Sequence, residues 1–261
     1  MHLIAYLRAM MRRMILLFVV VLPVVLHAEG LRILFMGDSI TDGGWGRSGG
    51  SMASAEERNQ KDLNHLYGHS FMLFCAAHFE SRYPEREYQF FNRGISGYTL
   101  CDLHERWERD IATLKPDVLS ILIGTNDVGK VVDSKEEQGR AFDPEAWEQS
   151  YRALLTKTRK AFPSIRLILC TPFVAPTGRM ATRAYYPQYE AGVQACTEVV
   201  HRLAVEFQAS VVDFHALMAE LHAQQDVSNK GYWIWDGIHP TAAGHRRMAD
   251  HWIEVATPLL Q

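Results

Sequence analysis

Short, almost continuous apolar runs recur along this chain of 261 residues, and stretches with helical spacing separate them. Runs of this kind predict strands that are buried on both faces of a parallel sheet. Strands that alternate with helices predict βαβ units, so we expect an α/β fold whose doubly wound, mostly parallel sheet of about five strands carries helices on both faces. The predicted strands are Arg32–Met36, Tyr88–Phe91, Val118–Ile123, Arg166–Cys170 and Ser210–Phe214.

Six stretches have the apolar spacing of helices. One has clear end signals, because Asp143 and Pro144 supply an N-cap and a first-turn proline, and Pro163 follows its end. With no internal repeat, residues 29–261 are expected to form one domain, which is long enough to bury a full core. The predicted helices are Leu66–Tyr83, Leu103–Leu114, Pro144–Phe162, Tyr189–Gln208, Phe214–Gln224 and Thr241 to about Thr257.

Composition excludes one class of function. The formal net charge is -3, and no stripe of Lys and Arg alternates with aromatic residues. A nucleic-acid-binding protein usually presents such a basic surface, so we do not expect nucleic acid as a partner. The oligomeric state cannot be read from the sequence.

The N-terminal residues have the pattern of an export signal. Arg8, Arg12 and Arg13 precede a continuous apolar run from Met14 to Leu26, and Ala28 follows it. This pattern is typical of a secretory signal peptide, and the run is short for a membrane span of about 20 residues. We therefore expect residues 1–28 to be removed, leaving a secreted or periplasmic protein without a stable membrane span. An uncleaved membrane anchor is the alternative.

The four cysteines do not indicate a metal site. Cys75, Cys101, Cys170 and Cys196 form no CxxC or CxxH pair, which argues against a zinc site. Buried thiols are the simpler interpretation, although an exported protein could oxidise a pair. Four cysteines allow three pairings, and the sequence does not choose among them.

Glycine and polar residues gather where the predicted strands end, and ligands bind at this edge of open parallel sheets. Four of these blocks, in this order, resemble the motifs of the GDSL/SGNH hydrolase family from Arg32 to about Trp252. The resemblance implies the flavodoxin-like SGNH fold for residues 29–261. The sequence departs from the family pattern at Ile40, where leucine is common. The blocks are Gly37-Asp38-Ser39-Ile40, Gly94 within Asn92–Gly97, Gly124-Thr125-Asn126-Asp127 and Asp236-Gly237-Ile238-His239-Pro240.

The residues of these blocks suit nucleophilic catalysis. A serine hydroxyl such as that of Ser39 needs a base, and the imidazole of His239 titrates near neutral pH. Asp236, three residues earlier, can orient the ring. The resemblance further implies an oxyanion hole made by the backbone N–H groups of Ser39 and Gly94 and the amide of Asn126. Glycine at 94 is expected to let substrate approach the backbone.

Each residue also has a simpler interpretation. Ser39 and Asn126 could be turn formers, Gly94 a loop glycine and His239 a surface residue, but their joint occurrence favours catalysis. Asp38 and Asp127 are expected to stabilise turns by binding backbone. Reading them as the paired carboxylates of a glycoside hydrolase would leave the serine and histidine without a role.

Aromatic and basic residues near the motifs are candidates for substrate binding. Trp45 and Arg47 follow the first block, Trp233 and Trp235 precede Asp236, and Tyr185 follows the fourth predicted strand. They could line a sugar-binding cleft, although tryptophans also serve as core or lid residues.

The resemblance implies esterase chemistry without a metal or cofactor, and with the export signal it predicts a secreted serine esterase that forms an acyl-enzyme on Ser39. Its substrate is expected to be a small-molecule or glycan ester, with O-deacetylation of a carbohydrate favoured. A lysophospholipase, short-chain lipid esterase or thioesterase is the alternative, and acyl transfer to a sugar uses the same intermediate. A catalytically silent glycan-binding module is the rival from another class.

Overall fold

The computed structural model of the protein describes residues 30–47, 58, 63–133, 141–224 and 228–261. The predicted signal peptide, residues 1–28, lies outside this part of the chain. Residues 48–57 and 59–62, between the helices Ser39–Asp42 and Phe71–Arg82, also lie outside it.

Five parallel strands form the central sheet, in the order β2-β1-β3-β4-β5. This is the flavodoxin-like strand order, in which the chain reverses direction of winding next to β1. The predicted α/β class and parallel sheet are therefore confirmed. The strands are β1 Arg32–Gly37, β2 Gln89–Gly94, β3 Val118–Leu122, β4 Arg166–Cys170 and β5 Ser210–Val212.

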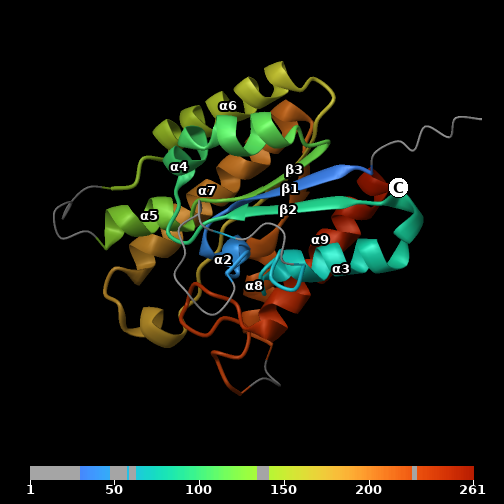
Figure 1. The fold of residues 1–261 in the computed structure, drawn as a ribbon. Helices are drawn as coiled ribbons and strands as arrows, with labels where there is room; N and C mark the ends of the chain where they lie inside the picture. The colour runs from blue at the N-terminus through green and yellow to red at the C-terminus, as the bar shows by residue number, and fades with distance from the viewer. Residues whose placement is uncertain (1–29, 48–57, 59–62, 134–140, 225–227) are drawn as a thin grey trace, which may run out of the picture.

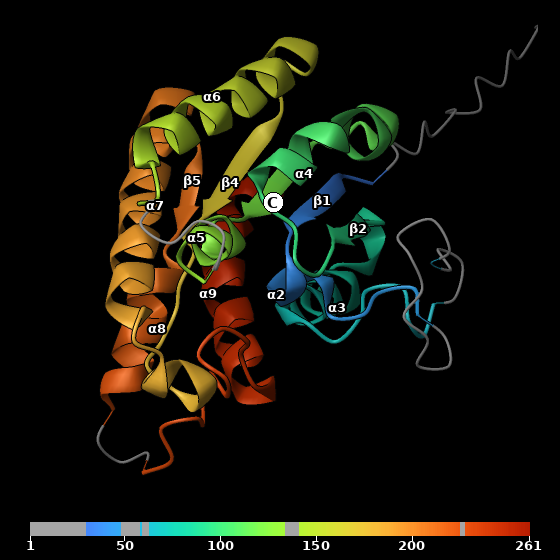
Figure 2. The same cartoon turned by 90° about the vertical axis from the view of Figure 1, so that its left-hand side faces the viewer.

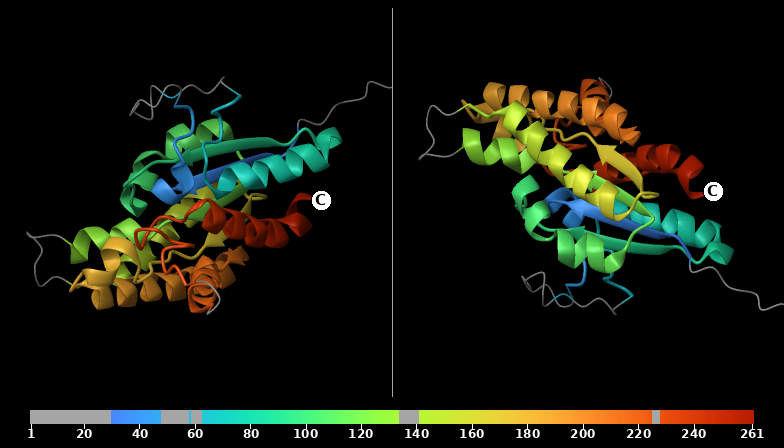
Figure 3. Two further views of the ribbon diagram at one scale, coloured as in Figure 1. Left: turned by 90° about the horizontal axis from the view of Figure 1, so that it is seen from below. Right: turned by 90° about the horizontal axis from the view of Figure 1, so that it is seen from above.

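Helices cover both faces of the sheet. In Figure 1, α4 (Leu100–Glu105) and α6 (Pro144–Ala161) lie above the strands, and α3 (Phe71–Arg82) and α9 (Ala242–Leu260) lie below them. Figure 3 shows two packed pairs, α3 with α9 and α6 with α7 (Tyr186–Phe207). The remaining helices are the short α2 (Ser39–Asp42), α5 (Thr125–Val132) and α8 (Phe214–Ala223), with three single-turn segments η1 (Pro84–Arg86), η2 (Glu108–Ala112) and η3 (Gly178–Thr182).

The apolar runs become strands because both of their faces are covered. Every residue of β3 is buried, including Ser120, whose hydroxyl accepts a hydrogen bond from the indole N–H of Trp252 on α9 at 3.0 Å. A buried hydroxyl in the sheet is tolerated because it has this partner. Helix α6 begins as predicted, with the Asp143 side chain accepting from the N–H groups of Glu145 and Ala146.

Three boundaries differ from the prediction. Helix α3 begins at Phe71 rather than Leu66, because Gly68 adopts a positive φ of 74° that no helix residue has. Strand β2 continues through Gly94, so its motif block is part of the sheet. The predicted helix Leu103–Leu114 is split into α4 and the π-helical segment η2.

The described residues were also compared with the predictions on cysteines, metal sites and membrane spans. All four cysteines are free thiols, with Cys101 exposed and the other three buried. Within the described ranges no group of three or more His, Cys, Asp or Glu side chains could hold a metal ion. Of the helices described, none is both long and apolar enough to cross a membrane.

Candidate active site

Ser39 is the first residue of α2, a single helical turn that follows directly from β1. The buried carboxyl of Asp38 caps this turn, because its Oδ1 accepts a hydrogen bond from the backbone N–H of Ile40 at 2.9 Å. Gly43 ends the turn at a φ of 52°, a conformation that glycine adopts without steric cost. Figure 2 shows α2 next to β1 and α3. The sequence predicts only a glycine-rich turn here, whereas Ser39 opens a short helix.

The three residues predicted as a triad form one chain of hydrogen bonds. Ser39 Oγ lies 2.9 Å from Nε2 of His239, and Nδ1 of the same ring lies 2.9 Å from Oδ2 of Asp236. With its proton on Nδ1, the ring donates to Asp236 and can accept the serine proton at Nε2. The serine and the histidine are 200 residues apart in the sequence, so this contact is made by the fold.

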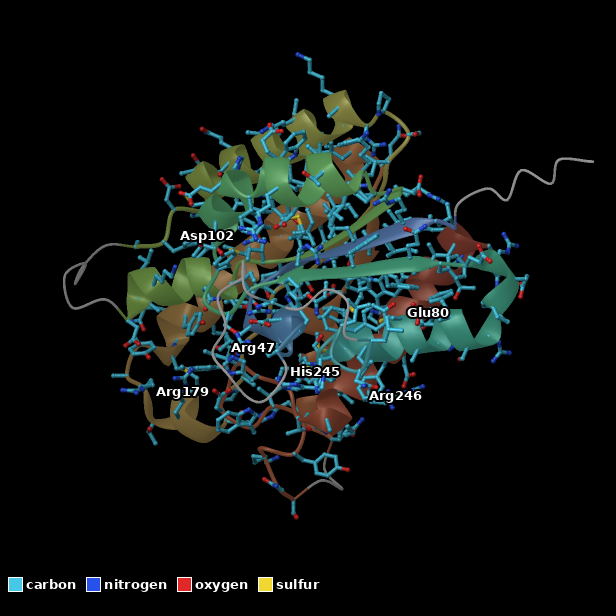
Figure 4. All side chains as sticks on the ribbon, in the orientation of Figure 1. Arg47, Glu80, Asp102, Arg179, His245 and Arg246 are labelled. Carbon is cyan, nitrogen blue, oxygen red and sulfur yellow. The ribbon has the colours of Figure 1, made fainter. Side chains whose placement is uncertain are left out.

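Asp236 is held in its ionised form. Burial opposes its charge, but hydrogen bonds from the His239 ring and from the backbone N–H groups of His239 and Ile238 outweigh burial and lower the pKa to about 2. Arg179, labelled on the η3 segment in Figure 4, places a cation 3.5 Å from Oδ2 of Asp236. No sequence motif marks Arg179, so it is not among the predicted site residues. A carboxylate that is charged at neutral pH can stabilise an imidazolium.

The segment after β4 supports the loop of residues 233–240. The Thr177 hydroxyl donates to the carbonyl oxygen of Ile234 at 2.7 Å. At Gly178, a Cβ would lie 2.3 Å from the carbonyl oxygen of Trp235, so the two backbones are in close contact. The position of the triad loop therefore depends on a segment about 60 residues earlier in the chain.

The predicted oxyanion donors lie at the carboxyl ends of β1, β2 and β3. The Gly94 N–H already donates to the side-chain oxygen of Asn92 at 2.9 Å, so substrate would have to share it. The Asn126 amide donates to the carbonyl of Tyr98 at 3.0 Å and has a second N–H for another acceptor. Asn126 lies at the start of α5, a helix that the sequence analysis did not predict.

Gly94 packs directly on α2. A Cβ at this position would lie 2.5 Å from the backbone nitrogen of Asp42 and 2.7 Å from Cβ of Thr41. Substrate access was the predicted reason for this glycine and stays a prediction, and the close contact between β2 and α2 is a second reason. Asn92, in the same motif block but without a predicted role, donates through Nδ2 to the carbonyl oxygens of Thr41 and Tyr67, each at 2.9 Å. Asn92 and Gly94 together hold the turn that carries the serine.

Trp45 is buried, with 1% of its surface exposed. Its indole N–H donates to the carbonyl oxygen of Gly94 at 2.7 Å, and the guanidinium groups of Arg58 and Arg93 lie 4.7 and 4.9 Å from its ring centre. Arg58 also makes hydrogen bonds of 2.6 and 3.0 Å to the carboxylate of Asp42. The expectation that Trp45 lines a substrate cleft disagrees with this burial, since the ring braces α2 and β2 from within.

The other basic and tyrosine candidates divide between two places. Arg47 lies 3.5 Å from the Asp42 carboxylate, and its side chain is 21% exposed. Tyr185 is half-buried and lines a pocket of about 340 Å³ together with Asn126. Of the two, Tyr185 shares a concave surface with a predicted oxyanion residue.

The two tryptophans before Asp236 differ in exposure. Trp235 is 60% exposed, and its ring is roughly parallel to that of His239, with 6.4 Å between ring centres and 27° between planes. Trp233 is half-buried, and its indole N–H has no hydrogen-bond partner among the described residues. Trp235 therefore offers an open aromatic face beside the predicted base, whereas the indole nitrogen of Trp233 is buried and is not open to a substrate.

Asp38 and Asp127 bind backbone groups, as predicted. Oδ1 of Asp127 accepts from the N–H of Leu100 at 2.9 Å, which ties α5 to the start of α4. Burial raises the pKa of Asp127, and burial raises that of Asp38 to about 7 against the effect of its hydrogen bond from Ile40. Burial therefore opposes ionisation of the Asp38 carboxyl group that caps α2.

The substitution Asp38→Asn is expected to remove a pH dependence of stability. The folded pKa of about 7 exceeds the reference value of 3.8, so the folded protein retains a proton that the unfolded chain has released. Stability from this group is present below pH 4 and is lost as pH rises to about 7, by at most on the order of 4 kcal/mol. The amide oxygen of the variant keeps the acceptor for Ile40. Urea unfolding of both proteins at pH 5 and pH 8 measures the effect, and parallel pH profiles would contradict it.

Known proteins resemble this chain over most of its length. The model of the GDSL-like Lipase/Acylhydrolase family matches residues 35–247. An acetylxylan esterase from Geobacillus stearothermophilus is 31% identical over 222 residues, which are 85% of this chain and 91% of that protein. A crystal structure from Parabacteroides merdae, of a protein assigned as a GDSL-like lipase, matches with a TM-score of 0.72 at 30% identity and covers 88% of this chain and 96% of that one.

The crystal structure of the Geobacillus stearothermophilus acetylxylan esterase is similar as well, with a TM-score of 0.67 at 28% identity. The match covers 87% of this chain and 94% of that one. Structures of two catalytic mutants of the same esterase also match, at 29% identity. In these mutants an aspartate, or the histidine three residues after it, is replaced by alanine.

Proposed function

Because the chain belongs to the GDSL-like lipase/acylhydrolase family and is a carboxylic ester hydrolase, we propose that it removes O-linked acetyl groups from a carbohydrate. Ser39 is the nucleophile, His239 the general base and Asp236 the residue that orients the base. The observation that carries the proposal is the continuous hydrogen-bonded chain of these three side chains, with 2.9 Å at each step. In the similar acetylxylan esterase, the aspartate and the histidine replaced in its catalytic mutants are three residues apart, as Asp236 and His239 are here.

The geometry supports a two-step mechanism. Nε2 of His239 takes the proton of Ser39 as Oγ bonds to the acetyl carbon, and the charge of the imidazolium is balanced by Asp236. The ring then gives this proton to the departing sugar oxygen, which leaves an acetyl group on Ser39. Water attacks this ester with the same base, releases acetate and restores the serine. Asp236 stays ionised throughout at neutral pH, since its pKa is about 2.

Stabilisation of the oxyanion is assigned to the backbone N–H of Ser39, the backbone N–H of Gly94 and the amide of Asn126. These three groups come from the ends of adjacent strands, β1, β2 and β3, which lie side by side in the sheet with β1 in the middle. The carbonyl of Tyr98 holds one N–H of Asn126 and so fixes the direction of the other. Donors that are fixed before reaction need no reorganisation as charge develops.

Recognition of the sugar is assigned to the groups around the triad loop. The open face of Trp235 beside His239 can stack on an apolar sugar face. Tyr185 lines the adjoining pocket. Such groups suit a polar, ring-shaped alcohol better than a flexible acyl chain.

Release of acetate from acetylated xylan and its oligosaccharides tests the proposal, with Ser39→Ala as the blank. The rate on p-nitrophenyl esters is expected to fall steeply from acetate to octanoate. A rate that rises with chain length would favour a lipid esterase instead. Labelling by a fluorophosphonate separates an active hydrolase from a binding module, because a wild-type protein that stays unlabelled would contradict the nucleophile.

Export is part of the proposal. The arginine-rich start and the apolar run from Met14 to Leu26 support removal of residues 1–28 during secretion. The intact mass of protein recovered from the medium or periplasm measures this step. A mass that includes residues 1–28, in a membrane fraction, would support the uncleaved anchor.

A further inference from the structure

We propose that a basic pocket beside the triad binds a carboxylate on the substrate, so that the preferred substrate is an acetylated glycan that contains a uronic acid. This inference rests on the proposed function, and it names the class of carbohydrate.

The pocket lies next to the residues assigned to catalysis. It has a volume of about 340 Å³, within the range of roughly 300–1,000 Å³ that is common for small-molecule sites. Asn126 is part of its lining, and so is Ile238, whose N–H binds the carboxylate of Asp236. A sugar whose acetyl group reaches Ser39 would therefore place a neighbouring substituent or sugar residue in this pocket.

The charge of the lining is positive. Lys130 on α5, Arg179 on η3 and Arg183 just after η3 face the pocket, and Asp133 is the acidic residue among its described lining. Three cations face two carboxylates, Asp133 in the lining and Asp236 at 3.5 Å from Arg179, so these described residues leave a local excess of one positive charge in a chain whose formal net charge is -3. The excess is thus a property of this site rather than of the whole protein.

Local contacts neutralise only part of this charge. Asp133 interacts with the hydroxyl of Tyr185, whose pKa is raised by burial and by this carboxylate. Arg179 lies 3.5 Å from Asp236, and Arg183 lies 6.0 Å from the ring centre of Tyr185. Lys130 is exposed in the last turn of α5. A neutral sugar would leave the excess positive charge of the lining uncompensated, whereas a carboxylate can accept charge-assisted hydrogen bonds from these cations.

Matched substrates make the test specific. The acidic substrate is a set of acetylated xylooligosaccharides that carry glucuronic acid. The neutral substrate is the same set with its carboxyl groups reduced to hydroxymethyl groups before acetylation. We expect wild-type kcat/KM to be about tenfold higher on the acidic set, and 0.5 M NaCl to narrow this ratio because salt screens exposed charges.

Lys130→Gln and Arg183→Gln are each expected to lower kcat/KM on the acidic set about fivefold and on the neutral set less than twofold. Lys160→Gln is the matched control, since Lys160 is an exposed cation on α6 outside this lining. All three variants should unfold at the wild-type temperature, which excludes a general loss of structure.

The outcomes distinguish the two proposals. Equal rates on both glycan sets, or an acid preference unchanged in both variants, would overturn the carboxylate inference and leave deacetylation standing. Activity on p-nitrophenyl acetate without activity on either glycan would overturn the proposed function itself. A preference for lysophosphatidylglycerol that both variants lose would assign the pocket to a lipid phosphate and would overturn the inference.

Discussion

Alanine at Ser39, at His239 or at both positions is expected to lower kcat on p-nitrophenyl acetate by the same factor, about 10³-fold or more. The two side chains act as one unit, because the hydroxyl is reactive only while Nε2 of the ring, 2.9 Å away, removes its proton. Once either group is lost, the other has no function left to lose. The residual rate comes from the oxyanion donors and from binding.

Initial rates of the wild type, both single variants and the double variant measure this coupling. The control is His201→Ala, which removes another histidine paired with an aspartate, at 3.0 Å from Asp213, but without a described role in the site. It is expected to keep wild-type activity. If the two single losses multiplied in the double variant, the groups would act independently and the proposed relay would be wrong.

The sheet was predictable from local apolar runs, and the meeting of Ser39, His239 and Asp236 was predictable from the motif blocks at the ends of those runs. β3 and β4 are continuous apolar runs, and the structure places them within one residue of their predicted ends. The carboxyl ends of parallel strands meet at one edge, so residues after different strands could be expected to approach each other. Asp236 and His239 are three residues apart, which made their contact predictable without knowledge of the fold.

Interactions between distant segments account for most of what the sequence did not predict. The helix predicted over Leu103–Leu114 is interrupted where Arg106 pairs with Asp110 through two hydrogen bonds, of 2.7 and 2.9 Å, and Arg93 from β2 lies 3.7 Å from the same carboxylate. Apolar periodicity carries no signal for such a buried ion-pair cluster.

The side chains that surround the motif residues could not be predicted from the sequence either. Trp45 is covered by two arginines, one of them on β2 and distant in the chain, so its burial could not be distinguished from a place on a cleft wall. Arg179 lies in no recognisable motif, and the contacts of Thr177 and Gly178 with the triad loop bring it to Asp236. The positions of side chains around a motif depend on packing between distant segments, which a sequence pattern does not show.

Gly94→Ala is expected to impair stability and catalysis together. The added Cβ would lie 2.5 Å from the Asp42 nitrogen and 2.7 and 2.8 Å from atoms of Thr41, and the two backbone atoms among these cannot rotate away. Overpacking of this kind typically costs about 1–3 kcal/mol of unfolding free energy. Relief of the clash must push α2 away from β2, and Ser39 is the first residue of α2.

A displacement of Ser39 by about 1 Å is enough to lower kcat on the order of 10²-fold. Urea unfolding measures the stability, and kcat on p-nitrophenyl acetate with the rate of fluorophosphonate labelling measures the serine. Gly231→Ala is the matched control, because the nearest atom to its Cβ would lie at 3.5 Å, an ordinary contact. If substrate access were the reason for glycine at 94, stability would not change and labelling by a small reagent would stay fast. A loss of both stability and labelling rate would instead show that glycine at 94 is needed to position the turn that carries Ser39.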